Sequence, residues 1–362
     1  MILQSSSLLR TLRRSVLLVM PLAAASTARA QWSPQNPGTD ASFRGMSIVS
    51  PEVVWISGTK GTFAWTTDAG KQWHPGHVAG AESFDFRAVH AISLDTALLM
   101  VSSQDTALIY RTTDRGQSWT LQYRDASKGA FLDAMAFFDS RHGLAVGDPV
   151  NGHFVLLETT DGGQSWSRIP DSNIPPALAG EGAFAASGTA LITCGSNNAW
   201  FGTGGAKLSR VFHSADAGRT WSVADTPIQA GAAPAGIFSL ACRDAQHIIA
   251  VGGNYSKPDA TTVTVALSND GGATWTASPP AAPTRFLSGV AYLTDTNGRR
   301  LIAVGTEGTA FSVDAGRTWS AMDSLSLNVV MTKGNGTAWA AGAHGSVAIL
   351  VALHSGINVR MR

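Results

Sequence analysis

Residues Thr112–Trp119 read Thr-Thr-Asp-Arg-Gly-Gln-Ser-Trp, and the pattern Ser/Thr-x-Asp-x-Gly-x-Ser/Thr-Trp occurs six times in the chain of 362 residues. The other copies occupy residues 66–73, 159–166, 214–221, 268–275 and 312–319. The first copy departs slightly, with Gln72 in place of Ser or Thr. Successive tryptophans are separated by 46, 47, 55, 54 and 44 residues. A motif that returns at this period indicates a repeat architecture.

Each position of the motif has a physical role in a tight turn. The Asp carboxylate accepts hydrogen bonds from nearby backbone amides, and the opening hydroxyl bonds back across the turn. The Gly permits a positive φ, and the Trp buries a large ring whose indole N–H requires an acceptor. The motif therefore predicts a β-hairpin turn with a strand beginning at the Trp. We interpret the repeated residues as structural; they are Asp68, Trp73, Asp114, Trp119, Asp161, Trp166, Asp216, Trp221, Asp270, Trp275, Asp314 and Trp319.

The sequence around each motif has the layout of one propeller blade. In residues 137–166, a strand end and turn precede a short strand at Leu144–Gly147, a third strand covers Phe154–Thr159, and a fourth strand follows Trp166. Four short antiparallel strands in about 45 residues are the size of one blade. The composition agrees, because 38 Gly and only 14% charged residues suit many short strands and tight turns.

A seventh blade is predicted from the two ends of the chain. Residues 328–351 contain two or three further strands with no motif after them. Residues 31–36 look like the strand that follows a motif. We therefore expect the N-terminal strand to complete the last blade, close the ring and cover an open edge. The prediction is an all-β, seven-bladed propeller of four-stranded antiparallel blades, with six or eight blades as the alternatives.

The first 30 residues have the pattern of a signal peptide. Arg10, Arg13 and Arg14 precede the apolar run Val16–Ala25, and small residues lead to a cleavage site after Ala30. An uncleaved anchor is the alternative, and the arginine pair leaves twin-arginine and ordinary export both open. No later stretch is long and apolar enough for a membrane span. We expect a single mature domain of residues 31–362, periplasmic or secreted.

The repeats are similar to the Asp-box, or BNR, repeat of sialidases, sortilin-type receptors and a family of exported propellers that includes the photosystem II stability and assembly factors. The fuller consensus resembles this last family. A Trp-x-x-Gly-x-x-Gly stretch at 55–61 leads into the first motif, residues 301–311 repeat the layout, and residues 342–345 echo it. The resemblance covers residues 32–351. It implies a binding scaffold whose partner is another envelope protein or a complex under assembly.

Loops on one face of a propeller usually meet the ligand, and this analogy with other propellers nominates binding residues. They are Arg44, Arg87, Arg285, Asp133, Asp148, Glu181, Tyr255 and Glu307. The three arginines suit an anion-binding mouth, because guanidinium groups bind carboxylates in bidentate fashion. The alternative is that they pair locally with Asp85, Asp133 or Glu181 and hold loops in place.

An enzyme is the competing interpretation, as a glycan-acting hydrolase with two carboxylates on the same face. A sialidase is disfavoured, because Arg44 and Arg87 are not followed by Ile-Pro. Of the four tyrosines, Tyr110 and Tyr123 are expected away from the channel, whereas Tyr255 lies in a suitable loop and Tyr292 could face the channel. No catalytic residue, metal site or cofactor is assigned, since no His pair has ligand spacing and no phosphate loop opens a helix. The net charge of +1 and the lack of a basic stripe predict no nucleic-acid partner.

The two cysteines, Cys194 and Cys242, fall near the distal ends of the innermost strands of neighbouring blades four and five. Innermost strands converge on the axis of a propeller, so a disulfide is one expectation in an exported protein. Two buried free thiols are the other.

Overall fold

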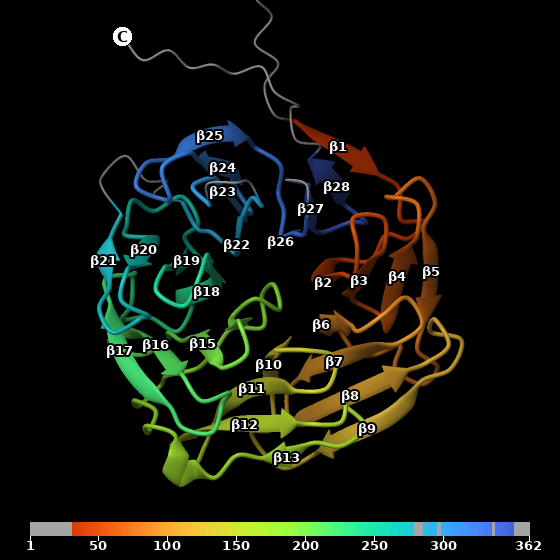
Figure 1. Cartoon of the computed structure of the whole chain (residues 1–362), viewed down its shortest axis with the longest axis horizontal. Helices are drawn as coiled ribbons and strands as arrows, with labels where there is room; N and C mark the ends of the chain where they lie inside the picture. The colour runs from red at the N-terminus through yellow and green to blue at the C-terminus, as the bar shows by residue number, and fades with distance from the viewer. Residues whose placement is uncertain (1–30, 279–284, 295–297, 335–336, 351–362) are drawn as a thin grey trace, which may run out of the picture.

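The computed structural model describes residues 31–278, 285–294, 298–334 and 337–350, and the predicted signal peptide at 1–30 lies outside them. The described strands form seven four-stranded antiparallel sheets around a common axis (Figure 1). The innermost strand of each sheet contacts those of the two neighbouring sheets. The predicted seven-bladed propeller is therefore confirmed.

In blades one to six, the four strands are arranged in sequence order, with the first strand nearest the axis and the fourth outermost. Blades one to three contain β2 (Phe43–Ile48), β3 (Val54–Gly58), β4 (Thr62–Thr66), β5 (His74–His77), β6 (Phe86–Ala91), β7 (Ala97–Ser103), β8 (Thr106–Thr112), β9 (Thr120–Asp125), β10 (Leu132–Phe137), β11 (Gly143–Val150), β12 (His153–Thr159) and β13 (Ser167–Arg168). The short 3-10 helix η1 (Asp171–Asn173) follows. Blades four to six contain β14 (Leu191–Cys194), β15 (Asn198–Gly202), β16 (Ser209–Ser214), β17 (Ser222–Thr226), β18 (Ala235–Cys242), β19 (Ile248–Asn254), β20 (Val265–Ser268), β21 (Thr276–Ala277), β22 (Gly289–Tyr292), β23 (Leu301–Gly305), β24 (Gly308–Ser312) and β25 (Ser320–Asp323).

The seventh blade joins the two ends of the chain. Its strands are β26 (Val329–Thr332), β27 (Ala338–Ala341), β28 (Val347–Leu350) and, outermost, β1 (Trp32–Gln35). β1 pairs antiparallel with β28, with Trp32 opposite Leu350. The Trp32 ring is buried, and its Nε1 donates to Thr309 Oγ1 of blade six at 3.0 Å. The N-terminal strand thus closes the ring, as the sequence predicted.

The Asp-box lies between the third and fourth strands of blades one to six, and its hydrogen bonds are those the motif predicts. In the second copy, Thr112 Oγ1 donates to Asp114 Oδ1 at 2.7 Å, Gly116 N donates to Thr112 Oγ1 at 2.9 Å, and Ser118 N donates to Asp114 Oδ1 at 2.9 Å. Hydrogen bonds from Ser118 above all lower the pKa of Asp114 to about 2. The carboxylate is therefore an ionised, structural acceptor.

The glycine of each box also lies against the preceding blade. A Cβ on Gly163, in blade three, would lie 2.1 Å from Leu98 Cδ2 in blade two. A Cβ on Gly218 would lie 2.7 Å from Leu144, and one on Gly272 2.9 Å from Trp200 Nε1. The box glycine is therefore required both for its positive φ, 78° at Gly163, and for close packing between blades.

The expectation of an acceptor for every box indole is wrong for half of the motifs. Nε1 of Trp221, Trp275 and Trp319 donates to the box glycine carbonyl at 2.9–3.1 Å. Nε1 of Trp73, Trp119 and Trp166 is buried with no acceptor. These three indoles instead make edge-to-face contacts with Trp339, Trp55 and Phe137, with interplanar angles of 81–89°. Aromatic neighbours thus take the place of an acceptor.

Candidate functional site

Four innermost strands carry a β-bulge at the same position. The pairing registers of β2, β6, β10 and β18 each skip one residue near the start of the strand. The skipped residues are Arg44, Arg87, Asp133 and Phe238. A bulge leaves its residue out of the ladder and re-aims the side chain. The bulges therefore place these side chains together at one mouth of the central channel.

Residues 181–189, between η1 and β14, cross this mouth, and we call them the channel-crossing segment. In Figure 1 the chain here runs inward, beside β10 and β15, toward the centre of the ring. Arg44 Nη1 of blade one donates to Ala186 O at 3.4 Å, and Arg87 Nη1 of blade two donates to Ala185 O at 3.2 Å. Asp148 Oδ1 of blade three accepts from Ala183 N at 3.2 Å. Charged side chains of three blades thus hold the backbone of this segment.

A buried ion pair fixes the start of the segment. Glu181 and Arg210 form a two-pronged ion pair, with Arg210 Nε at 2.9 Å from Glu181 Oε1. Thr203 Oγ1 donates to Glu181 Oε1 at 2.6 Å, and the Glu181 side chain is 0% exposed. Both carboxylate oxygens of Glu181 therefore have hydrogen-bond partners within the chain. Burial of such a pair is tolerated only because its hydrogen bonds are satisfied.

Blade five fixes the end of the segment. Leu240 N donates to Thr189 O at 2.9 Å, and the hydroxyls of Thr189 and Ser239 lie 2.7 Å apart. The Phe184 ring stacks on Phe238 with centroids 4.0 Å apart. The segment is thus tied to blade five by main-chain, hydroxyl and ring contacts together.

Arg44 and Arg87 give the mouth an excess of positive charge. Burial, and then the charge of Arg87, lower the pKa of Arg44. The nearest carboxylate is Asp85, 3.8 Å from Arg87 Nη2, and Arg87 Nε is buried with no hydrogen-bond partner. The Arg87 side chain remains 32% exposed. Two adjacent guanidinium groups with unpaired N–H donors are best stabilised by a bound anion.

Asp133 and Asp148 lie on the blade-three side of the mouth. Burial first, and the neighbouring Asp148 second, raise the pKa of Asp133 well above its usual value. Burial also raises the pKa of Asp148. Asp133 is 1% exposed, and its Oδ2 has no hydrogen-bond partner. Burial thus favours the neutral forms of both acids, while the charge of Arg87 acts in the opposite direction and lowers the pKa of Asp133.

The opposite side of the mouth is aromatic. Phe238 packs edge-to-face on Phe286, with ring centroids 4.8 Å apart, and contacts Tyr255 at 6.0 Å. Tyr255 is 55% exposed, whereas Phe238 and Phe286 are buried. Tyr255 is thus the outermost ring of this cluster.

Arg285 and Glu307 lie apart from the arginine pair. Arg285 precedes β22 in blade six, and its Nη1 donates to Glu307 O, in the β23–β24 turn, at 3.0 Å. The structure therefore brings together Arg44 and Arg87 of the predicted three-arginine mouth, while Arg285 holds a loop of its own blade. Holding a loop is the role that the sequence left open as the alternative, although Arg285 binds a carbonyl and not one of the carboxylates named there. Arg87 does lie near one of them, Asp85, at 3.8 Å.

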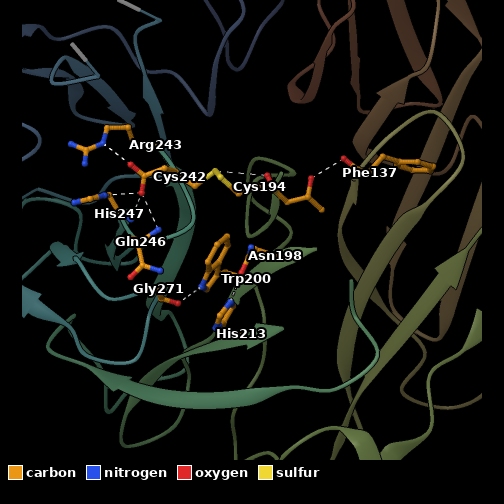
Figure 2. The surroundings of a disulfide bond; sticks show 12 residues. Phe137, Cys194, Asn198, Trp200, His213, Cys242, Arg243, Gln246, His247 and Gly271 are labelled. Atoms are coloured by element: carbon orange, nitrogen blue, oxygen red, sulfur yellow. Dashed lines mark hydrogen bonds and ion pairs between the residues drawn. A yellow bond between two sulfur atoms is a disulfide. The ribbon is translucent and has the colours of Figure 1, made fainter. Parts of the chain in front are cut away.

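The other mouth of the channel contains a cavity of 920 Å³. The distal ends of β14, β18, β22 and β26 line it, with Thr193, Cys242, Tyr292 and Thr332 among the side chains. Burial raises the pKa of Tyr292 to about 12. Cys194 and Cys242 are joined by a disulfide in the same region, with Cα atoms 6.4 Å apart (Figure 2).

Within the part of the chain that the structure describes, no three His, Cys, Asp or Glu side chains gather as a metal site would require. No helix among the described residues is long and apolar enough to cross a membrane.

The fold and the boxes define a seven-bladed Asp-box propeller with an arginine pair at one mouth. The sequence profile of the family described as Photosynthesis system II assembly factor YCF48 matches residues 24–125 and 125–270, which is more than half of the chain. The protein therefore belongs to this family. A search of the curated proteins found no match.

Solved structures show the same fold at low sequence identity. "YCF48 bound to D1 peptide" is 16% identical with a TM-score of 0.65, over 90% of this chain and 97% of that chain. YCF48 from Cyanidioschyzon merolae is 15% identical with a TM-score of 0.65, over 89% and 99% of the two chains. The GH74 xyloglucanase from Xanthomonas campestris is 15% identical with a TM-score of 0.59, over 88% of this chain and 53% of that chain.

The channel-crossing segment is the part of the site that the sequence did not predict. It uses the longest interval between boxes, the 55 residues from Trp166 to Trp221. This interval and the next one, of 54 residues, exceed the other intervals of 44–47 residues and so indicate insertions in blades four and five. Nothing in that interval shows where the insertion goes, because its contacts are with blades one, two, three and five.

Proposed function

We propose that this chain is an exported, non-catalytic binding propeller that assists the assembly or stability of an envelope protein complex. It holds a carboxylate-bearing segment of a partner protein at the channel mouth. The observation that carries the proposal is the pair of guanidinium groups on the bulges of blades one and two, Arg44 and Arg87, with no carboxylate closer than Asp85 at 3.8 Å.

Three features support this choice. Membership of the assembly-factor family, and the peptide bound by a structural relative, favour a protein partner. The mouth already binds main-chain carbonyls, because Arg44 and Arg87 donate to two turn residues of the channel-crossing segment. The exposed Tyr255 ring offers an apolar contact beside the charges. A rigid aromatic group beside arginine anchors is typical of protein-binding hot spots.

A glycan-acting hydrolase is the alternative, and Asp133 and Asp148 are the carboxylates it would use. Their raised pKa values suit a general acid. However, Asp133 is 1% exposed, and Asp148 accepts a hydrogen bond from Ala183 N of the channel-crossing segment. A sugar reaches this pair only after the segment moves, so we favour the binding function.

The test is affinity capture from the native envelope, with residues 31–362 as bait and mass spectrometry as the readout. The variant Arg44→Gln/Arg87→Gln keeps side-chain length and removes both charges. We expect its capture of the specific partner to fall at least tenfold, since truncating one buried charge contact costs about 2–5 kcal/mol. Arg285→Gln is the matched control, because Arg285 lies on the same face but outside the pair.

Equal capture by the double variant and the wild type, with both folded by circular dichroism, would refute the arginine mouth. Recovery of background proteins alone would refute the scaffold role and direct attention to Asp148 in a glycan-hydrolysis screen. Export is tested separately, by mass spectrometry of the processed protein. An N-terminus at Gln31 is expected, and an intact Met1 in the envelope fraction would contradict cleavage.

A further inference from the structure

The inner strand of blade four is shorter than those of blades one, two, three and five. β14 covers four residues, Leu191–Cys194, as do β22 and β26 in blades six and seven, whereas β2, β6 and β10 have six residues each and β18 has eight. The chain that would form the first half of this strand leaves the blade as the channel-crossing segment. β14 therefore has only four residues paired with β15 to hold it in place.

The disulfide ties this short strand to the next blade. Cys194 is the last residue of β14, and Cys242 is the last residue of β18. In Figure 2 the bond lies between the two strands, with Trp200 on one side and Arg243 on the other. The opposite end of the same strand pair carries the Leu240–Thr189 and Thr189–Ser239 hydrogen bonds. The disulfide thus anchors the strand that leads out of the channel-crossing segment.

The two ends of the segment are held by different chemistry. The Glu181–Arg210 ion pair at its start is buried and independent of redox state. The anchor beyond its end is a disulfide, which a thiol breaks. Both cysteines are half-buried, and Cys242 lines the 920 Å³ cavity at the other mouth of the channel. A cavity of this size admits a small dithiol or an extended reducing peptide.

We propose that the Cys194–Cys242 disulfide is a redox latch on the channel-crossing segment, reduced by a dithiol that enters through the cavity. One thiolate of the dithiol attacks Cys242 Sγ, the S–S bond breaks, and Cys194 leaves as a thiolate. The second thiolate of the reductant then attacks the mixed disulfide and releases Cys242. Two electrons pass to the protein, the two cysteines end as thiols with the two protons of the dithiol, and the reductant becomes a disulfide.

Reduction removes the covalent tie between β14 and blade five and leaves the end of the segment held by hydrogen bonds and ring contacts alone. The segment then opens more often, and Arg44 and Arg87 lose the carbonyls they bind. The latch therefore controls how much of the arginine pair is open to a partner. This last step rests on the proposed function, whereas the latch itself does not.

Hydrogen exchange with mass spectrometry on the protein as isolated, without any partner, tests the latch. Dithiothreitol under native conditions should open the bond, with two thiols per chain labelled by iodoacetamide. Exchange in peptides covering 182–190 should then become at least tenfold faster. Peptides from β7, residues 97–103, are the internal control and should not change. Reoxidation with diamide should restore slow exchange, which separates the latch from unfolding.

The variant Cys194→Ser/Cys242→Ser should show the fast exchange at 182–190 without reductant and no response to dithiothreitol. Unchanged exchange at 182–190 after both thiols are labelled would overturn the proposal, as would thiols that appear only after global unfolding. Partner capture is the second readout, and the reduced protein should capture more. If exchange responds but capture of any partner is absent, the proposed function fails and the latch stands. If capture depends on Arg44 and Arg87 but exchange does not respond, the latch alone fails.

Discussion

Replacing the box glycine of blade three tests whether blades are joined through direct contact at this position. Gly163→Ala adds a methyl group at a backbone φ of 78°, and the new Cβ would lie 2.1 Å from Leu98 Cδ2. Leu98 is fully buried, so it has no free space into which to move. Gly152→Ala is the matched control, because Gly152 has a φ of 83° and no atom within 4 Å of the added Cβ.

The two substitutions share one energetic cost and differ in a second. A left-handed backbone with a Cβ costs roughly 1–2 kcal/mol, and both variants carry this cost. Forcing an extra methyl group into a packed core costs a further 1–3 kcal/mol or so, and only Gly163→Ala carries it. We therefore expect the free energy of unfolding to fall by about 1–2 kcal/mol in Gly152→Ala and about 2–5 kcal/mol in Gly163→Ala.

Guanidinium unfolding followed by tryptophan fluorescence measures both values. The double variant Leu98→Ala/Gly163→Ala completes the cycle. Once Leu98 is truncated, the glycine substitution should cost no more than it does at position 152. Equal losses for Gly163→Ala and Gly152→Ala, or no coupling between positions 98 and 163, would show that the box does not join the blades by contact.

Three further predictions follow from single contacts. Asp133→Asn should raise the free energy of unfolding at pH 7 and leave it unchanged below about pH 4. Burial raises the pKa of Asp133 in the folded protein, so wild-type stability falls as the pH rises from the unfolded pKa toward the folded pKa. Urea titrations at several pH values measure this, and a difference between variant and wild type that did not change with pH would contradict it. Trp32→Ala should lower the free energy of unfolding by about 3–5 kcal/mol, since it removes a buried indole and its hydrogen bond to Thr309, which join blade seven to blade six. A loss under 1 kcal/mol in chemical denaturation would mean that β1 does not contribute to closure of the propeller. Cys194→Ser/Cys242→Ser should cost about 4 kcal/mol for the 48-residue separation of the cysteines, and the same denaturation assay in dithiothreitol should abolish the difference from the wild type.

The hydrogen-bonded turn of the Asp-box could be predicted because its contacts are local, whereas the surroundings of the indole N–H groups could not. Thr112, Asp114, Gly116 and Ser118 bond to one another over two to four residues. The residue types at these fixed spacings therefore specify the donors, the acceptors and the positive φ of the turn. The blade count and the closing strand followed from the same repeats, since each strand could be matched to its equivalents.

The equivalence of Arg44 and Arg87 was also visible in the repeats, and the bulges place the two side chains together. The arrangement around them was not visible. Arg87 bonds to a carbonyl 98 residues away and Arg44 to one 142 residues away. Glu181 was assigned to the ligand face because nothing in its own segment marks Arg210 as its partner. The contact of Arg285 was not visible for the same reason, since Glu307 O lies in another loop.

The sequence by itself determined the repeat, the number of blades and the closure of the ring, because local turn chemistry and strand periodicity specify each blade independently. Only the tertiary structure decided what occupies the channel mouth, which charges remain uncompensated there, and whether the two cysteines are bonded. Those properties depend on the path of one insertion across the ring. That path is set by burial, by the Glu181–Arg210 ion pair and by contacts with four other blades. None of these contacts produces a repeating pattern in the sequence.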